Sequence, residues 1–368
     1  MFERTDAACA REVRDRFSRQ TLVDFDKLLA FAADGAVLAR AEAEALRAAL
    51  RTLQATPGWS ARSELINTYF KALGPLRERR PEARAALLGL GNVLAEDCAN
   101  GLLDAPLPVW GEACPAAPAG YRLPAGSERV GTAAWRAAHG EGLRQAIAST
   151  WLKGANGGPA VRSKTGPVLE EAAKYFATVK GLSQRGDSRL VPLELESLRA
   201  GEIVQQLGLA MELIASVDPE QAGEVRALTE YVVLLEGHEF VGGSDLRLFG
   251  ASFFALDPRW SPLCYADHLV HEAAHQLLHA TQELEPLLLN RSHMGAPSPI
   301  RADPRPLYGT FHATFVFLRL ASFMSKVVER RPHLEGEARL RLHRHMLGLL
   351  QGLEVVRRHA ELSPAGEA

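Results

Sequence analysis

Apolar residues recur at three- and four-residue steps along most of this 368-residue chain. That spacing puts them on one face of an α-helix, so it predicts a largely helical protein. Proline and glycine interrupt the pattern at several points, and both residues favour helix ends. Before residue 220 the spacing predicts helices over seven segments: 22–33, 41–53, 63–72, 82–99, 133–152, 167–179 and 193–217.

The pattern changes to strand-like runs after residue 229. The run 230–235 is aliphatic and β-branched, and 245–256 is apolar around Gly250, which suggests a bulge or a close approach. Helical spacing then returns over 263–284, 307–330 and 335–359. We therefore expect a mainly α fold with a small antiparallel β-sheet, of the α+β class, in which 245–256 is an exposed edge strand. We also expect two regions, a helical one over 1–155 and a metal-binding catalytic one over 156–368.

The charge balance and cysteine usage exclude several classes of protein. Lys+Arg is 42 and Asp+Glu is 44, and a net charge of -2 gives no overall field to hold a nucleic-acid backbone. The four cysteines form no C-x-x-C pair, which argues against a cysteine zinc site. The charged first residues lack the apolar core of a secretory signal. We expect a cytoplasmic protein, and nothing in the sequence indicates its oligomeric state.

The most apolar stretch of the chain is expected to be a buried helix and not a membrane span. It runs over 311–328 and carries His312, Arg319 and Lys326. Charged side chains within a hydrocarbon layer are costly, and no run of 18 apolar residues exists elsewhere. We therefore expect no membrane partner.

The predicted helix after the strands contains His271-Glu272-Ala273-Ala274-His275. Residues four apart project from one helix face, so the two imidazoles can share one metal ion. Glu272 lies about 100° round the helix, where it is a candidate base, an outer-sphere group or an occasional ligand. The motif follows a strand-like segment, as in the zincin fold of zinc proteases, and apolar flanks would bury the imidazoles. An accidental pair of hydrogen-bonded histidines is the alternative.

A third ligand is needed, and His312 is favoured among several candidates. It lies in an apolar helix that can pack antiparallel to the motif helix, and buried polar groups need partners. A histidine among phenylalanines is also a common core residue, so that alternative stays open. His279 is about 12 Å along the helix from His271, which suggests an outer-sphere or packing role. His293 falls in a loop, a poor position for a ligand.

Between the two helices, Arg301 and Arg305 lie four residues apart on a proline-stiffened stretch. A guanidinium presents a planar fork that matches a carboxylate in two hydrogen bonds. Such an arginine suits an enzyme that binds a dicarboxylate beside its metal. The alternative is that each arginine pairs with Asp303 or caps a helix.

These residues resemble the HExxH-type 2-oxoglutarate-dependent peptide β-hydroxylases, bacterial enzymes that modify ribosomally made peptides. The resemblance covers about 229–325 and rests on HEAAH followed by SPIRADPRPLYGTFHATFVF. It implies an Fe(II) centre at His271, His275 and His312, with Arg305 and also Arg301 on the oxoglutarate carboxylate. The usual iron site has two histidines and one carboxylate, and here that carboxylate is either Glu272 or absent.

Three functions compete at this point. The first is an Fe(II)- and 2-oxoglutarate-dependent dioxygenase that uses O2 to hydroxylate a β-carbon in a precursor peptide. The second is a zinc metallopeptidase in which Glu272 is the catalytic base. The third is a non-catalytic peptide-binding protein with a structural metal, which three protein ligands argue against because structural zinc sites have four.

Overall fold

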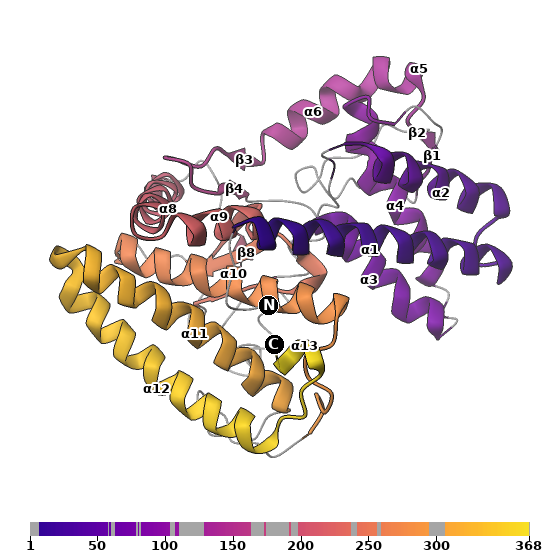
Figure 1. Ribbon diagram of the computed structural model, residues 1–368. Helices are drawn as coiled ribbons and strands as arrows, with labels where there is room; N and C mark the ends of the chain where they lie inside the picture. The colour runs from indigo at the N-terminus through magenta and orange to yellow at the C-terminus, as the bar shows by residue number, and fades with distance from the viewer. Residues whose placement is uncertain are drawn as a thin grey trace.

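The computed structural model describes residues 7–57, 59, 63–78, 80, 82–103, 107–109, 129–162, 173, 191–192, 198–236, 241–255, 259–293 and 306–367. Within them the chain is mostly helical with a small mixed sheet, so the predicted mainly α, α+β class is confirmed. Figure 1 gives the arrangement: the N-terminal helices lie on one side, and the long C-terminal helices lie next to one another on the other.

The N-terminal half is built from amphipathic helices. Its longer helices are α1 (Ala7–Asp34), α2 (Arg40–Ala55), α3 (Ser63–Arg77) and α4 (Glu82–Ala99). α1 begins well before the predicted residue 22, because Ala10, Val13 and Phe17 continue its buried face. Four short elements complete this half: the strands β1 (Leu107–Pro108) and β2 (Arg129–Val130), and the helices α5 (Ala133–Trp135) and α6 (Glu141–Ala148), joined by a π-helical turn. The predicted helix over 133–152 therefore ends early, at residue 148.

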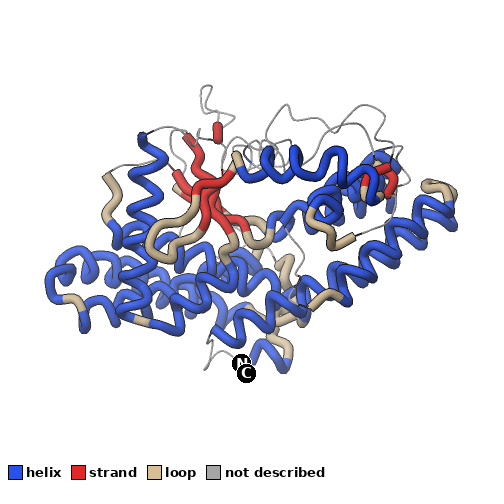
Figure 2. The backbone as a smooth tube through the Cα atoms, turned by 90° about the horizontal axis from the view of Figure 1, so that it is seen from above, coloured by secondary structure: helices blue, strands red, loops and turns tan. Residues whose placement is uncertain are grey.

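Six described strands, all within residues 151–255, form one sheet. Its strands are β3 (Trp151–Leu152), β4 (Ala160–Arg162), β5 (Val191–Pro192), β6 (Tyr231–Glu236), β7 (Gly242–Gly243) and β8 (Ala251–Ala255). The order is β3-β4-β6-β8-β7, with β5 also paired to β6. Figure 2 shows these strands gathered against the helices.

The sheet is mixed, so the expected antiparallel sheet is wrong in this respect. β6 runs parallel to both β4 and β8, while the β3, β5 and β7 pairings are antiparallel. The connection between β6 and β8 spans 237–250, and parallel strands need a crossover of about a dozen residues or more. A hairpin between β6 and β8 would have needed a shorter turn.

The segment 245–256 differs from the single exposed edge strand that its composition predicts. Leu246–Leu248 form a 3-10 turn capped by Asp245, and the strand begins only at Ala251. Gly250 separates the two with φ of 96°, a conformation that glycine adopts readily. β8 is paired on both sides, because β7 lies beyond it in the sheet order. The edge position therefore belongs to β7.

Two helices, α8 (Leu198–Val217) and α9 (Pro219–Leu228), precede β6, and three long ones follow the sheet. The latter are α10 (Pro262–Leu284), α11 (Leu307–Arg330) and α12 (Glu335–His359), and a short α13 (Pro364–Glu367) ends the described chain. The predicted bounds of these three long helices are confirmed to within one residue. Periodicity, proline and polar turns coincide at their ends, which makes them easy to locate from sequence.

Among the described helices, α11 alone is long and apolar enough to cross a membrane, by length and composition only. Fifty-six per cent of its apolar window is buried within the protein. Its Arg319 pairs with Glu224 and its Lys326 pairs with Asp218, both at α9. This burial and ion pairing are typical of a core helix, as expected.

The hydrophobic core is continuous across the predicted boundary at residue 155. One cluster of buried side chains runs from Ala10 to Ala338 and includes residues of both α1 and α10. Phe17 of α1 meets Phe249 edge-on with ring centroids 4.9 Å apart. Arg14 donates a hydrogen bond of 2.9 Å to the Ala227 carbonyl. The N-terminal helices thus contribute directly to the packing behind the metal-motif helix.

Candidate metal centre

The helix α10 carries the motif and is fixed at its start and on its sheet side. Ser261 caps it by accepting a hydrogen bond from the Cys264 amide at 3.1 Å, and Pro262 occupies the first turn. Gln276 ties the helix to the sheet: its Oε1 accepts from the Gly250 amide at 2.5 Å, and its Nε2 donates to Ser252 Oγ at 3.2 Å. These hydrogen bonds fix the position of α10 relative to the sheet, and with it the positions of the histidines on α10.

Three histidines follow one another at four-residue steps on a single face of α10. The Nε2 atoms of His271 and His275 are 3.0 Å apart. Two nitrogens that each bind one ion at about 2.0–2.1 Å, with an angle of about 90–110°, lie about 2.9–3.4 Å apart. The predicted pair therefore has the separation that shared coordination requires.

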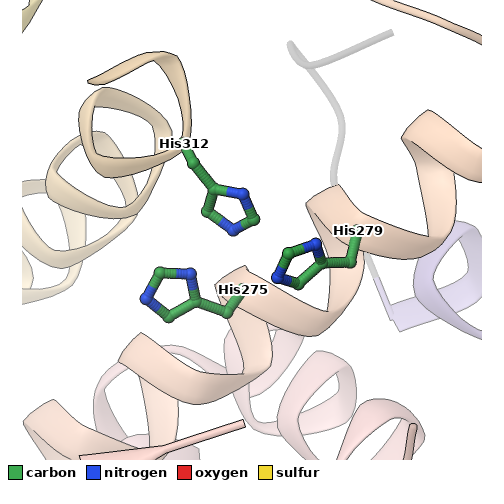
Figure 3. A group of neighbouring side chains, drawn as sticks. All are labelled: His275, His279 and His312. Atoms are coloured by element: carbon green, nitrogen blue, oxygen red, sulfur yellow. The ribbon is translucent and has the colours of Figure 1, made fainter. Parts of the chain in front are cut away.

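His312 reaches the same place from α11. Its ring centroid lies 4.6 Å from that of His275 and 4.2 Å from that of His279. The ligand atoms of His275, His279 and His312 all lie within 4.8 Å of one another, and Figure 3 shows these rings converging from the two helices. His312 is only 5% exposed, and its buried Nε2 has no hydrogen-bond partner among the described residues. A buried nitrogen of this kind needs a partner, and a metal ion supplies one.

The surroundings keep His279 and His312 neutral. Burial lowers the pKa of His279 to about 4; Asp245 opposes this shift and the charge of Arg291 adds to it. Burial also lowers the pKa of His312 well below its usual value, and the neighbouring His279 and His271 act in the same direction. Neutral imidazole is the form that binds a metal ion, so both side chains are ready to do so at pH 7.

His279 belongs to the cluster, although the sequence predicts only an outer-sphere or packing role for it. Its axial distance from His271 counted against it, but its near neighbours are His275, one turn away, and His312 of α11. Its Nδ1 shares a hydrogen bond of 2.8 Å with Tyr308 Oη. When Nδ1 carries the proton, Nε2 is left with a lone pair for a metal. The repeat of histidines at four-residue steps was the available signal.

Glu272 projects toward the sheet edge. Ser244 Oγ donates a hydrogen bond of 2.7 Å to its Oε2, and the side chain is 3% exposed. A Cβ at Gly242 would lie 3.3 Å from Glu272 Oε1, so β7 packs closely against this carboxylate. Glu272 is therefore a buried acceptor beside the edge strand, and no carboxylate belongs to the group of three close ligand atoms.

The structure describes only one of the three remaining candidate site residues. Arg301 and Arg305 lie outside the described residues. His293 is described, and its ring stacks on that of His359 with centroids 5.8 Å apart.

The donor set fits a divalent transition metal. Imidazole nitrogens suit iron, zinc, copper and nickel, whereas calcium and magnesium prefer oxygen ligands. Among the described residues, the close group of three possible ligand atoms consists of His275, His279 and His312. The predicted ligand His271 lies outside that group, although its Nε2 is 3.0 Å from that of His275. Comparison with protein-family models gives no matching family, and comparison with curated proteins gives no significant sequence match.

Proposed function

We propose that the histidine cluster binds Fe(II) and that the protein is an oxidoreductase, a 2-oxoglutarate-dependent dioxygenase that hydroxylates a β-carbon in a ribosomally made precursor peptide. The observation that supports it most is the buried Nε2 of His312, which lies close to His275 and His279 of α10 and has no hydrogen-bond partner in the part of the chain that the structure describes. In this proposal His271, His275 and His312 are the ligands. His279 supports them through its bond to Tyr308.

The choice of iron and oxoglutarate rests on the family resemblance together with the ligand chemistry. Bound Fe(II) with oxoglutarate and O2 would supply the oxidising chemistry, which protein side chains lack. The protein would provide the ligands, exclude water and hold the peptide. Arg305 and Arg301 stay the predicted partners of the oxoglutarate carboxylate, and a cytoplasmic site without nucleic acid or membrane is part of the same proposal.

The peptide has a candidate binding position at the sheet edge. Among the described strands, β7 is at the end of the order and pairs with β8 alone. An extended peptide can add to such an edge through main-chain hydrogen bonds. Because Glu272 lies beside β7 and one residue from His271, a peptide paired there would run close to the histidine cluster.

A zinc metallopeptidase is the second candidate, and Glu272 is the observation that favours it. A carboxylate next to a histidine ligand and beside an edge strand is where a general base would meet a metal-bound water. Ser244 would then hold the carboxylate in one orientation through the 2.7 Å hydrogen bond.

One assay separates the two candidates. Purified protein is supplied with Fe(II), oxoglutarate and peptides encoded beside the gene, and succinate release and peptide mass are measured. The proposal predicts Fe(II)-dependent succinate and a peptide heavier by one oxygen. Metal-dependent peptide cleavage without succinate would favour the peptidase instead. The variant His275→Ala is the control, because it removes a central imidazole of the cluster.

A further inference from the structure

An arginine that carries no motif lies beside the histidine cluster. The guanidinium carbon of Arg291 lies 4.6 Å from the centroid of the Tyr308 ring, so the cation stacks on that ring. The backbone is fixed as well, because the Tyr308 amide donates to the Arg291 carbonyl at 3.1 Å. Arg291 is therefore held at the start of α11 by both its main chain and its side chain.

Tyr308 connects this arginine to the candidate metal centre. The phenol shares the 2.8 Å hydrogen bond with His279, and its ring centroid lies 5.5 Å from that of His312. The Tyr308 ring thus lies between Arg291 and two histidines of the cluster, His279 and His312. Its charge is among the causes that lower the pKa of both histidines, so the cation acts on the cluster electrostatically.

The positive charge of Arg291 has no carboxylate partner among the described residues. The nearby acids are otherwise placed: Asp245 pairs with Arg247 at 2.7 Å, and Glu283 is exposed on the last turns of α10. Stacking on Tyr308 occupies one face of the guanidinium, and the planar N–H edges serve as a bidentate donor. A fixed, half-buried cation of this kind is suited to bind an anion.

We propose that Arg291, together with the Tyr308 phenol, binds a carboxylate group of a ligand that also reaches the histidine cluster. A small dicarboxylate fits best, because one carboxylate would meet the guanidinium while the rest of the molecule extends past Tyr308 toward the imidazoles. The carboxyl terminus of a peptide has the same chemistry and is the second source. The identification of the dicarboxylate as oxoglutarate rests on the proposed function. The carboxylate site itself rests only on the contacts of Arg291 and Tyr308.

This assignment adds a third arginine to the two expected from sequence. Arg301 and Arg305 are predicted from the stiffness of their segment. Arg291 is identified by its contacts, because it stacks on the Tyr308 ring and the Tyr308 hydroxyl is hydrogen-bonded to His279. This contact joins residues 17 positions apart in the sequence, and no local pattern reveals it.

The test is calorimetric titration of the wild type and three variants. Glutarate is titrated into metal-free protein, because it has two carboxylates but no keto group with which to chelate a metal. Oxoglutarate is titrated into anaerobic Fe(II) protein, and a pair of peptides with free or amidated carboxyl termini forms the third arm. The variants are Arg291→Gln, Arg291→Lys and, as a charge-matched control, the exposed Arg344→Gln of α12. Circular dichroism verifies that each variant is folded, and metal analysis verifies that each variant binds Fe(II) as the wild type does.

The proposal predicts that Arg291→Gln weakens glutarate and oxoglutarate binding about ten- to a hundredfold, while metal content stays constant. Arg291→Lys should recover little, because an ammonium lacks the planar fork. Arg344→Gln should match the wild type. Preference for the free-terminus peptide, lost in Arg291→Gln, would instead identify the peptide as the source.

Two results would overturn the carboxylate site. One is unchanged binding of every carboxylate ligand in Arg291→Gln; the other is no binding of any of them to the wild type. If oxoglutarate binds the Fe(II) protein but no carboxylate ligand depends on Arg291, the proposed function stands and this site is refuted. If only the peptide arm depends on Arg291, the carboxylate site stands with a peptide terminus as its ligand. If oxoglutarate does not bind the wild-type Fe(II) protein, the proposed function is refuted independently of the site.

Discussion

At the scale of single residues, the histidines of the cluster differ in what holds them. His271 is placed by its neighbour, since its Nε2 is 3.0 Å from that of His275. His279 is placed by Tyr308, which binds its Nδ1. His312 has a buried Nε2 for which the described residues offer no hydrogen-bond partner. These differences lead to different expectations for each substitution.

The first prediction ranks the four histidines by metal loss. His271→Ala, His275→Ala and His312→Ala should each reduce bound metal to background, because each removes one of three ligands. His279→Ala should retain most of the metal and weaken its affinity by about 10–100-fold, the usual effect of an outer-sphere partner. Elemental analysis after dialysis measures this. Metal retained in His271→Ala but lost in His279→Ala would establish His275, His279 and His312 as the ligand set.

The second prediction concerns acid and His268, which stacks on Trp260 with ring centroids 4.5 Å apart. Burial lowers its pKa to about 4; Asp267 opposes this shift, and the charges of Arg341 and His345 add to it. Between pH 6.5 and about 4 the unfolded chain then binds more protons at this position than the folded protein does. The free energy of unfolding must therefore fall as the pH falls through that window.

The size expected for this effect is about 1–2 kcal/mol at pH 4.5, reduced from the full shift because the ring is partly exposed. Urea unfolding of the metal-free protein at pH 7 and pH 4.5 measures it. His268→Gln cannot titrate, so it should lose less stability than the wild type over the same interval. Equal losses in the two proteins would show that His268 is not responsible.

At the scale of elements, α11 and α12 pack closely because glycine is present at their contact. A Cβ at Gly352 of α12 would lie 2.2 Å from Thr314 Oγ1 of α11. That hydroxyl is engaged, because it donates to the Thr310 carbonyl at 2.8 Å. The face of α11 that carries His312 is thus kept in position from behind by α12.

The third prediction compares two helical glycines. Gly352→Ala should destabilise the protein by about 1–3 kcal/mol, because Thr314 must move and give up its hydrogen bond. Gly89→Ala in α4 meets nothing within 4 Å and should stabilise by about 0.5–1 kcal/mol through helix propensity. Thermal and urea unfolding measure both. The same sign for the two substitutions would contradict the close packing of α11 on α12.

The sequence predicts elements better than it predicts how they pair. The bounds of α10, α11 and α12 follow from periodicity, which is a local property. The parallel pairing of β6 with β8 depends on the path of the chain between them, so composition alone suggested the wrong direction. The same contrast holds in the site. His271, His275 and His279 are neighbours by helix geometry, whereas the contacts of His279 with His312 and of Arg291 with Tyr308 depend on where α11 packs.

At the scale of the whole molecule, the N-terminal helices and the metal-motif helix share one core. α1 lies against α9 and α10, and Phe17 packs on Phe249 just ahead of β8. In Figure 1, α1 runs from the group of N-terminal helices to α9 and α10. A region 156–368 without α1 would expose apolar surface that the intact chain buries.

The fourth prediction follows from this shared core. A fragment of residues 156–368 should lack cooperative unfolding, because burying apolar surface is the main stabilising term and α1 covers part of it. Circular dichroism during heating measures cooperativity. A fragment that melts cooperatively and binds metal as the intact chain does would establish 156–368 as an independent domain.

The central claim is a histidine-held Fe(II) that accepts oxoglutarate. The most direct measurement is anaerobic titration of the Fe(II) protein with oxoglutarate, followed through the visible metal-to-ligand charge-transfer absorbance. We predict a saturable band at one equivalent of iron in the wild type, and none in His275→Ala or His312→Ala. Iron bound at full occupancy without such a band, or an unchanged band in both variants, would contradict the account.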